Sequence, residues 1–437
     1  MKYFKIAYNM LINRILFNLV IVLEIAAVLV LTNTVVATWN SKTMLYDPYK
    51  DILKNDGMVI YTGALDSANT AVLKKIQKEN GYNEVYMDNA KVAEYVEKTL
   101  KGDVKVYRTS VERFPAGENN GPTSTISTDN ESNILYYLMD KEVFDKFRLP
   151  LSEGRWASAE KNSDGEIEIV VSQGTTAELN KVYDTPAGKI KVVGILTSNT
   201  YTPPGTNANR SEDSSELESL FNYTGVFDLG VSTDAFAIVN RELFTTKGEM
   251  YHLPEDFWFV SYGKGLSSDD IKGNDDYLME NIGEAAMYDS NGDYETFKAL
   301  DNATQNEINK IYLQMLPIVL AALIVVLAGL IGSVAISTVK QIKNFGIFFL
   351  CGCRWKDCKK IITAQLAVLF AISCLFTVLS IWGMNAMNLN ADMGLTFKLN
   401  NVLISLAILA VMYLLAIILP RNIIKTSSPV ETIKENV

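Results

Sequence analysis

Four long apolar runs, one near the N-terminus and three near the C-terminus, limit the possible folds of the chain more than any other feature. They cover Ile15–Ala37, Met315–Ile336, Ile361–Ile381 and Val402–Leu419, with about 270 mostly polar residues between the first and the second. An α-helix needs about 20 apolar residues to cross a hydrocarbon core of about 30 Å. The sequence therefore predicts an integral membrane protein with four transmembrane helices, and most of its mass on one side of the membrane.

Basic residues in short loops predict the orientation, because lysine and arginine resist crossing the membrane. They gather before the first run, between the second and third, and after the fourth (Lys2, Lys5 and Arg14; Lys340, Lys343, Arg354, Lys356, Lys359 and Lys360; Arg421, Lys425 and Lys434). Residues 383–400, between the third and fourth runs, contain only Lys398 against Asp392. We expect cytoplasmic N- and C-termini and an external segment at 39–310.

The first run is predicted to be a retained anchor within a domain at 1–38. This stretch is 23 residues long, against the 7–15 residues of a signal-peptide core, and no clear small-x-small cleavage site follows. The chain is rich in lysine, asparagine and isoleucine. This composition indicates a bacterium whose genome has a low G+C content. We therefore expect a multi-pass protein of the bacterial cytoplasmic membrane.

The external segment is acidic and contains no cysteine. Residues 39–310 contain 27 basic and 45 acidic side chains, a net charge near −18. This charge argues against binding nucleic acid or anionic lipid there, and it is consistent with solubility or with attraction to cationic peptides. Its fold cannot depend on disulfides, and its length is sufficient for a stable core and for two subdomains.

The external segment alternates between strand-like and helix-like patterns, which predicts an α/β domain. Strands are expected at 58–62, 104–111, 134–138, 166–171, 189–196, 234–239 and 257–262, and helices at 66–80, 90–100 and around 142–147. The polar stretches 115–133 and 203–218 are expected to be exposed loops, and their role is open. A charged helix at 293–314 runs into the second span, and the first helix is expected to continue beyond its apolar run. Unbroken helices on both sides of the domain could act as stiff levers.

Three segments resemble the permease subunits of MacB/FtsX-like ABC transporters. The first combines LPLSEGRW at 149–156, EIVVS at 168–172 and KIKVVGIL at 189–196. The second is FGIFFLCGCRWKDCKKI at 345–361, and the third is the tail 420–434 with its Pro-Val-Glu at 429–431. The resemblance implies a MacB-like core domain at 39–310. It also implies an FtsX-like domain at 311–437, with a cytoplasmic coupling loop at 338–360 and a cytoplasmic tail at 420–437.

The resemblance further implies a permease that works by mechanotransmission with a separate ATPase. The chain has no G-x-x-x-x-G-K-[ST] motif, so we expect ATP and Mg²⁺ to bind the partner and not this chain. We expect no enzyme activity in this chain, no catalytic residue and no bound cofactor. Expected partners are a P-loop ATPase, the lipid membrane, and a second copy of the chain or a related permease. The cargo class would be peptides, including antimicrobial peptides, lipoproteins or lipid-linked molecules.

The loop after the second span is the predicted coupling site. Its residues are expected to form a short amphipathic helix that docks on the ATPase, with Arg354 and Trp355 as anchors. The full predicted set is Phe345, Gly346, Ile347, Leu350, Gly352, Arg354, Trp355, Lys356 and Asp357. The alternative is a simple interfacial connector that obeys the positive-inside rule and has no partner.

Other candidate sites carry weaker signals. His252 is the single histidine, so neither a multi-histidine metal site nor a Ser-His-Asp set is expected. In CGCRWKDC, the C-x-C-x4-C spacing lacks a paired C-x2-C or a histidine partner, which favours reduced packing cysteines over a metal site.

Two features within the spans could serve packing or function. Glu24 is an intramembrane carboxylate and thus a functional candidate, or it is a protonated or hydrogen-bonded glutamate facing a residue such as Gln365 or Ser373. The small residues Ala328, Gly329, Gly332 and Ser333 allow close helix contact, either between two copies or within one chain.

A second class of function is open. The external domain could sense a ligand or activate a cell-wall hydrolase, so that the protein signals without transport. Movement of a substrate would distinguish the two classes of function, because only a transporter moves a substrate.

Overall fold

The computed structural model describes residues 2–12, 15–63, 73–75, 78, 89–112, 121–125, 134–197, 200–204, 217–221, 223–224, 235–244, 255–282, 294–386, 395 and 397–427. The chain divides into two compact units. One comprises Met1–Asn40 and Lys310–Val437 and is called the membrane unit below. The other, Ser41–Asn309, is called the sheet unit.

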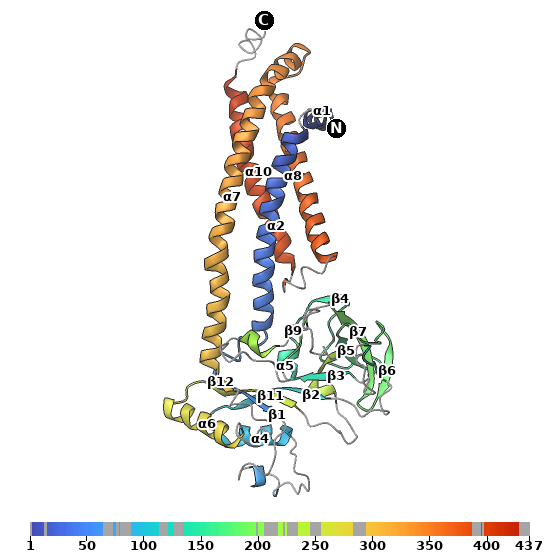
Figure 1. Cartoon of the computed structure of the whole chain (residues 1–437), viewed down its shortest axis with the longest axis vertical. Coiled ribbons are helices and arrows are strands. Elements are labelled where there is room, and N and C mark those ends of the chain that lie inside the picture. Colours follow the sequence, from blue (N-terminus) through green and yellow to red (C-terminus); the bar gives the residue numbers. More distant parts are fainter. Residues whose placement is uncertain are drawn as a thin grey trace. The chain divides into compact units, whose positions relative to one another are not determined.

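Among the residues that the structure describes, four helices are long and apolar enough to cross a membrane, as the sequence predicts. They are α2 (Ile15–Tyr46), α7 (Phe297–Leu350), α8 (Trp355–Ala386) and α10 (Leu399–Thr426). A shorter helix, α1 (Lys2–Ile12), precedes α2 and packs against α8. All of them can be followed in Figure 1. The expected continuation of the helices is confirmed, because α2 and α7 each run unbroken through residues of both units.

The membrane unit is held together by one apolar core and by polar contacts at the two ends of α10. The core contains Ile25 of α2, Leu330 of α7, Ile361 of α8 and Ala416 of α10, all fully buried. At the start of α10, a cluster of asparagines joins this helix to α2.

That cluster consists of direct side-chain hydrogen bonds. Asn33 Nδ2 donates to Ser405 Oγ at 2.7 Å, and Asn40 Nδ2 donates to Asn401 Oδ1 at 2.8 Å. Asn400 Nδ2 donates in turn to Asn40 Oδ1 at 2.7 Å. Because these amides are removed from water, their mutual hydrogen bonds avoid the cost of buried unpaired polar groups.

The sheet unit is built on one mixed sheet of ten strands. Its order is β12-β1-β11-β2-β3-β10-β5-β7-β4, with β6 also paired to β7. The strands are β1 (Asp56–Gly63), β2 (Lys105–Glu112), β3 (Leu135–Met139), β4 (Leu151–Gly154), β5 (Ile167–Val171), β6 (Val182–Thr185), β7 (Gly188–Leu196), β10 (Phe236–Asn240), β11 (Glu255–Gly263) and β12 (Tyr294–Thr296). The pairs β3–β10 and β5–β7 are parallel, and the other pairs are antiparallel.

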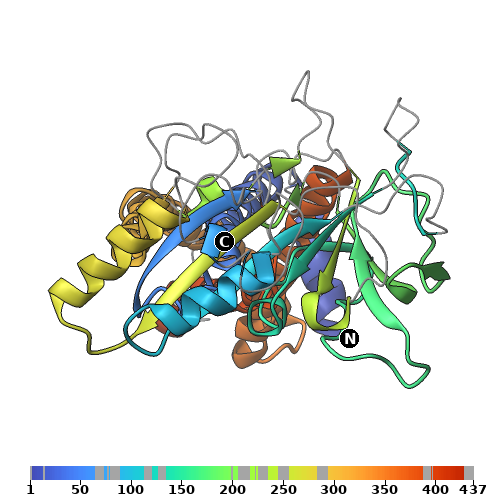
Figure 2. The same cartoon turned by 90° about the horizontal axis from the view of Figure 1, so that it is seen from below.

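Each face of this sheet carries its own core, because successive residues of a strand point to opposite faces. On β11, Phe257 and Phe259 join one core while Trp258 and Val260 join another. The core of Trp258 is covered by α4 (Asn89–Thr99) and α6 (Ser268–Asn281), which cross that face of the strands in Figure 2. Further along the sheet, β3, β10, β5 and β7 bury a third cluster on the side opposite to the Phe257 core.

The Phe257 core includes the parts of α2 and α7 that belong to the sheet unit. Leu45 at the end of α2 and Leu300 near the start of α7 are buried there with Phe259. Short elements complete the unit: α5 (Lys141–Phe144), the 3₁₀ turns η1 (Leu217–Leu220) and η2 (Arg241–Leu243), and the two-stranded sheet of β8 (Thr200–Tyr201) and β9 (Tyr223–Thr224). The predicted mixture of helices and strands is therefore confirmed as an α/β fold with an extensive mixed sheet.

The expected strands that the structure describes are all present, with small shifts at their ends. The helix expected at 66–80 and the loops at 115–133 and 203–218 lie mostly outside the described residues. The ten strands of the main sheet are continuous, β8 and β9 form a separate pair, and the expected division into two subdomains stays a prediction.

Candidate functional site

The turn between α7 and α8 is a tightly capped reversal of the chain. Gly352 has a φ of +87°, the left-handed conformation that favours glycine at a helix end. The N–H of Gly352 donates to Phe349 O at 3.0 Å, and that of Cys353 donates to Phe348 O at 2.9 Å. This pair of bonds is the Schellman motif, which satisfies the last carbonyls of α7.

The capped turn corrects one expectation. The sequence predicted a short amphipathic helix over 345–360, whereas the structure has the last turn of α7, the reversal at 351–354 and the first turn of α8. The physical reason is Gly352, because its left-handed conformation ends α7 and sends the chain back.

The tip of this turn presents apolar and basic side chains together. Ile347 and Leu350 are 56% and 67% exposed, and Arg354 and Lys356 are also exposed. Asp357 lies in the first turn of α8 and pairs with Lys360 at 2.9 Å. Exposed apolar groups beside free cations form a surface suited to a protein partner.

Other residues of the predicted coupling set hold the turn to the bundle. Phe345 is fully buried in the membrane-unit core, and Gly346 is buried beside it. The indole Nε1 of Trp355 donates to Ile424 O of α10 at 2.8 Å, and its ring makes an edge contact with Phe349. Trp355 therefore connects α8 to α10. Its position next to Arg354 in the sequence gave no indication of this contact.

Glu24 and the small-residue stripe lie next to each other in the membrane unit. The Glu24 carboxylate oxygen Oε2 lies 3.7 Å from the position that a Cβ on Gly329 would take. The Glu24 carboxylate thus lies near α7, and the suggested neighbours Gln365 and Ser373 of α8 stay a prediction. Ala328 and Gly329 are exposed on α7, and Gly332 has no neighbouring atom within 4 Å of a built Cβ.

A hydrogen-bonded junction joins the ends of α2 and α7 inside the sheet unit. The Tyr46 phenol donates to Asp301 Oδ1 at 2.6 Å. Gln305 Nε2 donates to Asp301 Oδ2 at 2.8 Å and to the Tyr46 oxygen at 3.2 Å. Thr304 Oγ1 accepts the N–H of Leu217 at 2.9 Å, which adds the η1 turn to the junction.

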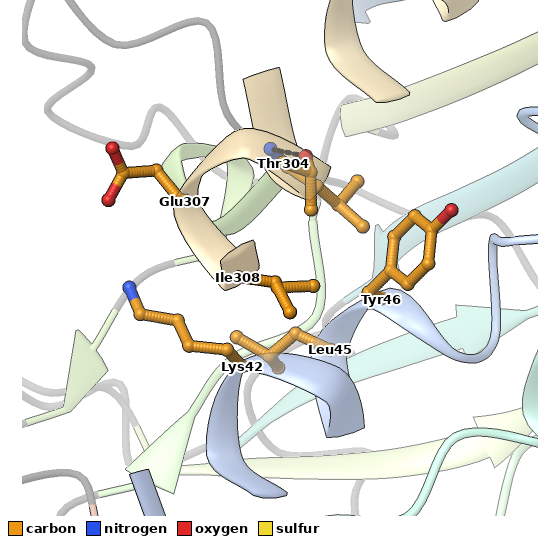
Figure 3. Close-up of a pocket in the computed structure, with 7 residues that line it drawn as sticks. Lys42, Leu45, Tyr46, Thr304, Glu307 and Ile308 are labelled. Carbon is orange, nitrogen blue, oxygen red and sulfur yellow. Dashed lines mark hydrogen bonds between the residues drawn. The ribbon is translucent and has the colours of Figure 1, made fainter. Parts of the chain in front are cut away.

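Figure 3 shows the small pocket beside this junction. Side chains of α2 and α7 line it, together with Leu217: Lys42, Leu45, Tyr46, Thr304, Glu307 and Ile308. Its volume of about 10 Å³ is near the minimum for one water molecule, so it is a packing gap and not a ligand site. The sequence predicts that these helices act as levers, but it gave no indication of the residues that fasten them.

The three parts of the first resembling segment meet in space on β4, β5 and β7. The two N–H groups of the Arg155 guanidinium bind both oxygens of Glu168, one of them at 2.7 Å, and the N–H of Ser158 adds a bond at 2.9 Å. Bonds from Arg155 hold the pKa of Glu168 below its usual value, although the burial of this carboxylate acts in the opposite direction. Glycines allow the close approach: a Cβ on Gly154 would lie 2.2 Å from Val193 O.

A second internal ion pair fastens the middle of the sheet. Arg241 Nε donates to Asp140 Oδ1 at 2.9 Å, and its terminal nitrogens donate to Ser110 Oγ and Leu138 O. Asp140 Oδ2 also accepts the N–H of Arg108 at 2.5 Å. These bonds connect β2, β3 and the residue that follows β10, so they fix the sheet and are not available to a ligand.

Within the described ranges, no group of three or more histidine, cysteine, aspartate or glutamate side chains could hold a metal ion. His252 and the Pro-Val-Glu at 429–431 lie outside those ranges. The four cysteines are free thiols.

The fold and these sites define a multi-pass membrane protein with a mixed α/β unit between its first and second membrane helices. No protein-family model and no curated protein matches the chain. Among solved structures, the chain is similar to the extracellular domain of the noncanonic ABC-type transporter YknZ from Gram-positive bacteria. That match has 12% identity and a TM-score of 0.22 over 55% of this chain and 99% of the other.

The chain is also similar to the periplasmic region of MacB from Actinobacillus actinomycetemcomitans. This match has 13% identity and a TM-score of 0.26 over 61% of this chain and 98% of the other. At identities and TM-scores this low, the likeness assigns no function to this chain.

Proposed function

We propose that this chain is the permease subunit of an ATP-driven transporter of the MacB/FtsX-like class, located in the bacterial cytoplasmic membrane. The observation that carries the proposal is the capped turn between α7 and α8, with exposed Ile347, Leu350, Arg354 and Lys356 at its tip. The basic residues near this turn support a cytoplasmic location for it, and the tip would dock on a P-loop ATPase that binds ATP and Mg²⁺.

The mechanism is transmission of force through α7 and α2. The turn directly follows α7, and α7 continues without a break into the sheet unit. Tyr46, Asp301 and Gln305 bind the ends of α2 and α7 to each other there. A displacement of the turn by ATPase closure would therefore move residues that are fastened to the sheet, and the external sheet unit would respond.

A second copy of the chain or a related permease would complete the machine. The exposed Ala328 and Gly329 and the open space at Gly332 support close helix contact between copies along α7. Peptides, lipoproteins or lipid-linked molecules are the proposed cargo, handled by the acidic sheet unit outside the membrane. A peptide of positive charge fits the net negative charge of that segment.

The test is capture of an ATPase by the full-length chain from cells that express it, followed by measurement of ATP hydrolysis. We expect Arg354→Glu to reduce capture at least tenfold, because it reverses a charge at the tip and leaves the core untouched. Lys181→Glu is the matched control, because it reverses an exposed charge within the sheet unit. Trp355→Phe separates docking from stability, because it removes the bond to Ile424 O and keeps an aromatic ring at this position.

Two results would count against the proposal. Capture that Arg354→Glu leaves unchanged would exclude this turn as the docking site. ATP hydrolysis that activates an external hydrolase without moving any peptide or lipid would replace transport with signalling.

A further inference from the structure

The start of α8 and the end of α10 lie side by side in the membrane unit and run in opposite directions. Trp355 near the start of α8 bonds to Ile424 O near the end of α10. Further along α8, Thr363 Oγ1 accepts a hydrogen bond from Arg421 Nη2 at 3.3 Å, and Thr363 O accepts one from the Tyr413 phenol at 3.3 Å. These bonds hold the first turns of α8 against the last turns of α10.

Basic side chains gather on both helices at this contact. Arg421 and Lys425 are exposed one turn apart on α10, whose sequence contains no acidic residue. On α8, Lys359 is partly exposed, and its backbone carbonyl accepts a hydrogen bond from Thr363 Oγ1 at 2.7 Å. Lys359 lies one turn before Thr363 and therefore on the same helix face, the one that contacts Arg421. Lys359, Arg421 and Lys425 are called the basic cluster below.

The acidic residue nearest to the basic cluster along α8 is already paired with another cation. Asp357 forms an ion pair with Lys360 at 2.9 Å. Because Lys360 offsets the charge of Asp357, the basic cluster keeps a net positive charge.

An exposed apolar stripe continues from the basic cluster along α10. Leu414 and Ile418 are exposed, and they share one face of the helix with Arg421 and Lys425, because these positions follow each other at spacings of four, three and four residues. α10 is apolar and long enough to cross a membrane, so this stripe would lie against acyl chains. The face therefore combines an apolar surface with a cationic end, as a phospholipid combines acyl chains with a headgroup.

We propose that the basic cluster binds the headgroup of an anionic phospholipid, whose acyl chains lie along Leu414 and Ile418. The planar guanidinium of Arg421 presents several N–H donors and suits a phosphate, and its bond to Thr363 uses one of its nitrogens. The two lysines add point charges. Basic pockets between membrane helices on the cytoplasmic side are typical sites for anionic headgroups, and the sequence predicts this end of α8 and α10 to be cytoplasmic.

The apolar stripe favours a lipid over a protein partner. A water-soluble protein would reach Arg421 and Lys425, but it would not reach Leu414 and Ile418 on the membrane-spanning part of the helix. The basic cluster is also distinct from the tip residues proposed to dock on the ATPase. Lipid binding here requires no ATPase, so it can be tested separately from the proposed function.

The experiment is native mass spectrometry of the full-length chain in detergent, with equal amounts of phosphatidylglycerol and phosphatidylcholine. We expect the chain to retain phosphatidylglycerol about tenfold better, because only this lipid carries a net negative charge. Arg421→Gln and Lys425→Gln should each lower that preference about fivefold, the scale of one basic residue near an anionic lipid surface. Added glycerol phosphate should not displace the bound lipid, because it lacks the acyl chains.

Two controls accompany these variants. Lys340→Gln removes an exposed charge from α7, outside the basic cluster, and should change the preference less than twofold. Thermal unfolding without added lipid shows whether Arg421→Gln is folded, and Lys425→Gln tests the same site with the bond from Arg421 to Thr363 intact.

Four results would overturn the proposed lipid site. The first is a preference for phosphatidylglycerol that Arg421→Gln and Lys425→Gln leave unchanged. The second is an equal loss in Lys340→Gln, which would mean general attraction to the basic surface. Displacement of the lipid by glycerol phosphate would identify a site for free phosphates. Loss of ATPase capture in Lys425→Gln with unchanged lipid binding would assign the cluster to the protein partner.

Discussion

The Tyr46 phenol donates a 2.6 Å hydrogen bond to Asp301, and this bond joins the end of α2 to the start of α7 within the sheet unit. The two residues are separated by nearly the whole external segment in sequence. Gln305 strengthens the pair by donating to both partners. These hydrogen bonds therefore fasten the ends of the two long helices to each other within the sheet unit.

Removal of the Tyr46 hydroxyl group tests the contribution of this hydrogen bond. We expect Tyr46→Phe to lower the free energy of unfolding by about 1–3 kcal/mol, because Asp301 loses its strongest partner while half-buried. Thermal unfolding of the full-length chain in detergent measures the change. Tyr294→Phe is the control, because this phenol on β12 is exposed and should change the stability by less than about 0.5 kcal/mol. Equal stability of Tyr46→Phe and wild type would show that the junction is held by apolar packing alone.

The Arg155–Glu168 pair predicts a pH dependence of stability. The folded-state pKa of Glu168 is lowered, chiefly by its bonds to Arg155, so the pair stabilises the fold above the ordinary carboxyl pKa of about 4.3. That contribution is lost as the pH falls through the lower, folded-state pKa.

Arg155→Met should therefore cost about 1–3 kcal/mol at pH 7, because it leaves a buried carboxylate without its charged partner. The difference from wild type should shrink as the pH falls below 4, where Glu168 becomes protonated. Chemical unfolding at pH 7 and at successively lower pH measures this trend. A difference that stays constant with pH would mean that Arg155 contributes through packing only.

The sequence predicts the helices and strands that depend on the composition of a short stretch of residues. The four spans follow from apolar runs long enough for a membrane, and the strands β5 and β7 follow from dense β-branched residues such as those of Ile167–Val171. Short strands with polar residues gave no such signal. β4 carries Ser152 and Glu153, and it exists because Gly154 and Gly194 let two backbones approach closely.

The turn between α7 and α8 was predictable in position but not in form, and its coupling role stays a prediction. Its charges and apolar residues are visible in the sequence, whereas the left-handed Gly352 and the bond from Trp355 to Ile424 depend on how α7, α8 and α10 meet. The junction of Tyr46 and Asp301 was missed for the same reason. Contacts between residues so far apart in sequence leave no local pattern.

The small-residue stripe on α7 predicts a contact between copies. Gly332→Leu should leave the single chain folded, because a Cβ built at this position has no atom within 4 Å. If two copies pack closely along α7, the added bulk should weaken their association about tenfold, equivalent to about 1.4 kcal/mol. Energy transfer between labelled copies, measured on dilution in lipid vesicles, reports this change. Leu403→Ile, at an exposed position of α10, is the control, and equal association of Gly332→Leu and wild type would place the interface elsewhere.

The capped turn makes a last prediction, which concerns backbone conformation alone. Gly352→Ala should destabilise the chain by about 1–2 kcal/mol, because alanine disfavours a φ of +87°. No atom lies within 4 Å of a Cβ built at this position, so a steric clash contributes nothing to the cost. Gly352→Asn is the matched control, since asparagine tolerates the left-handed conformation and should recover most of the loss. Thermal unfolding in detergent compares the variants. If alanine and asparagine were equally tolerated, the end of α7 would not depend on the Schellman cap, and the tip residues Ile347 and Arg354 would have to be positioned by the bundle instead.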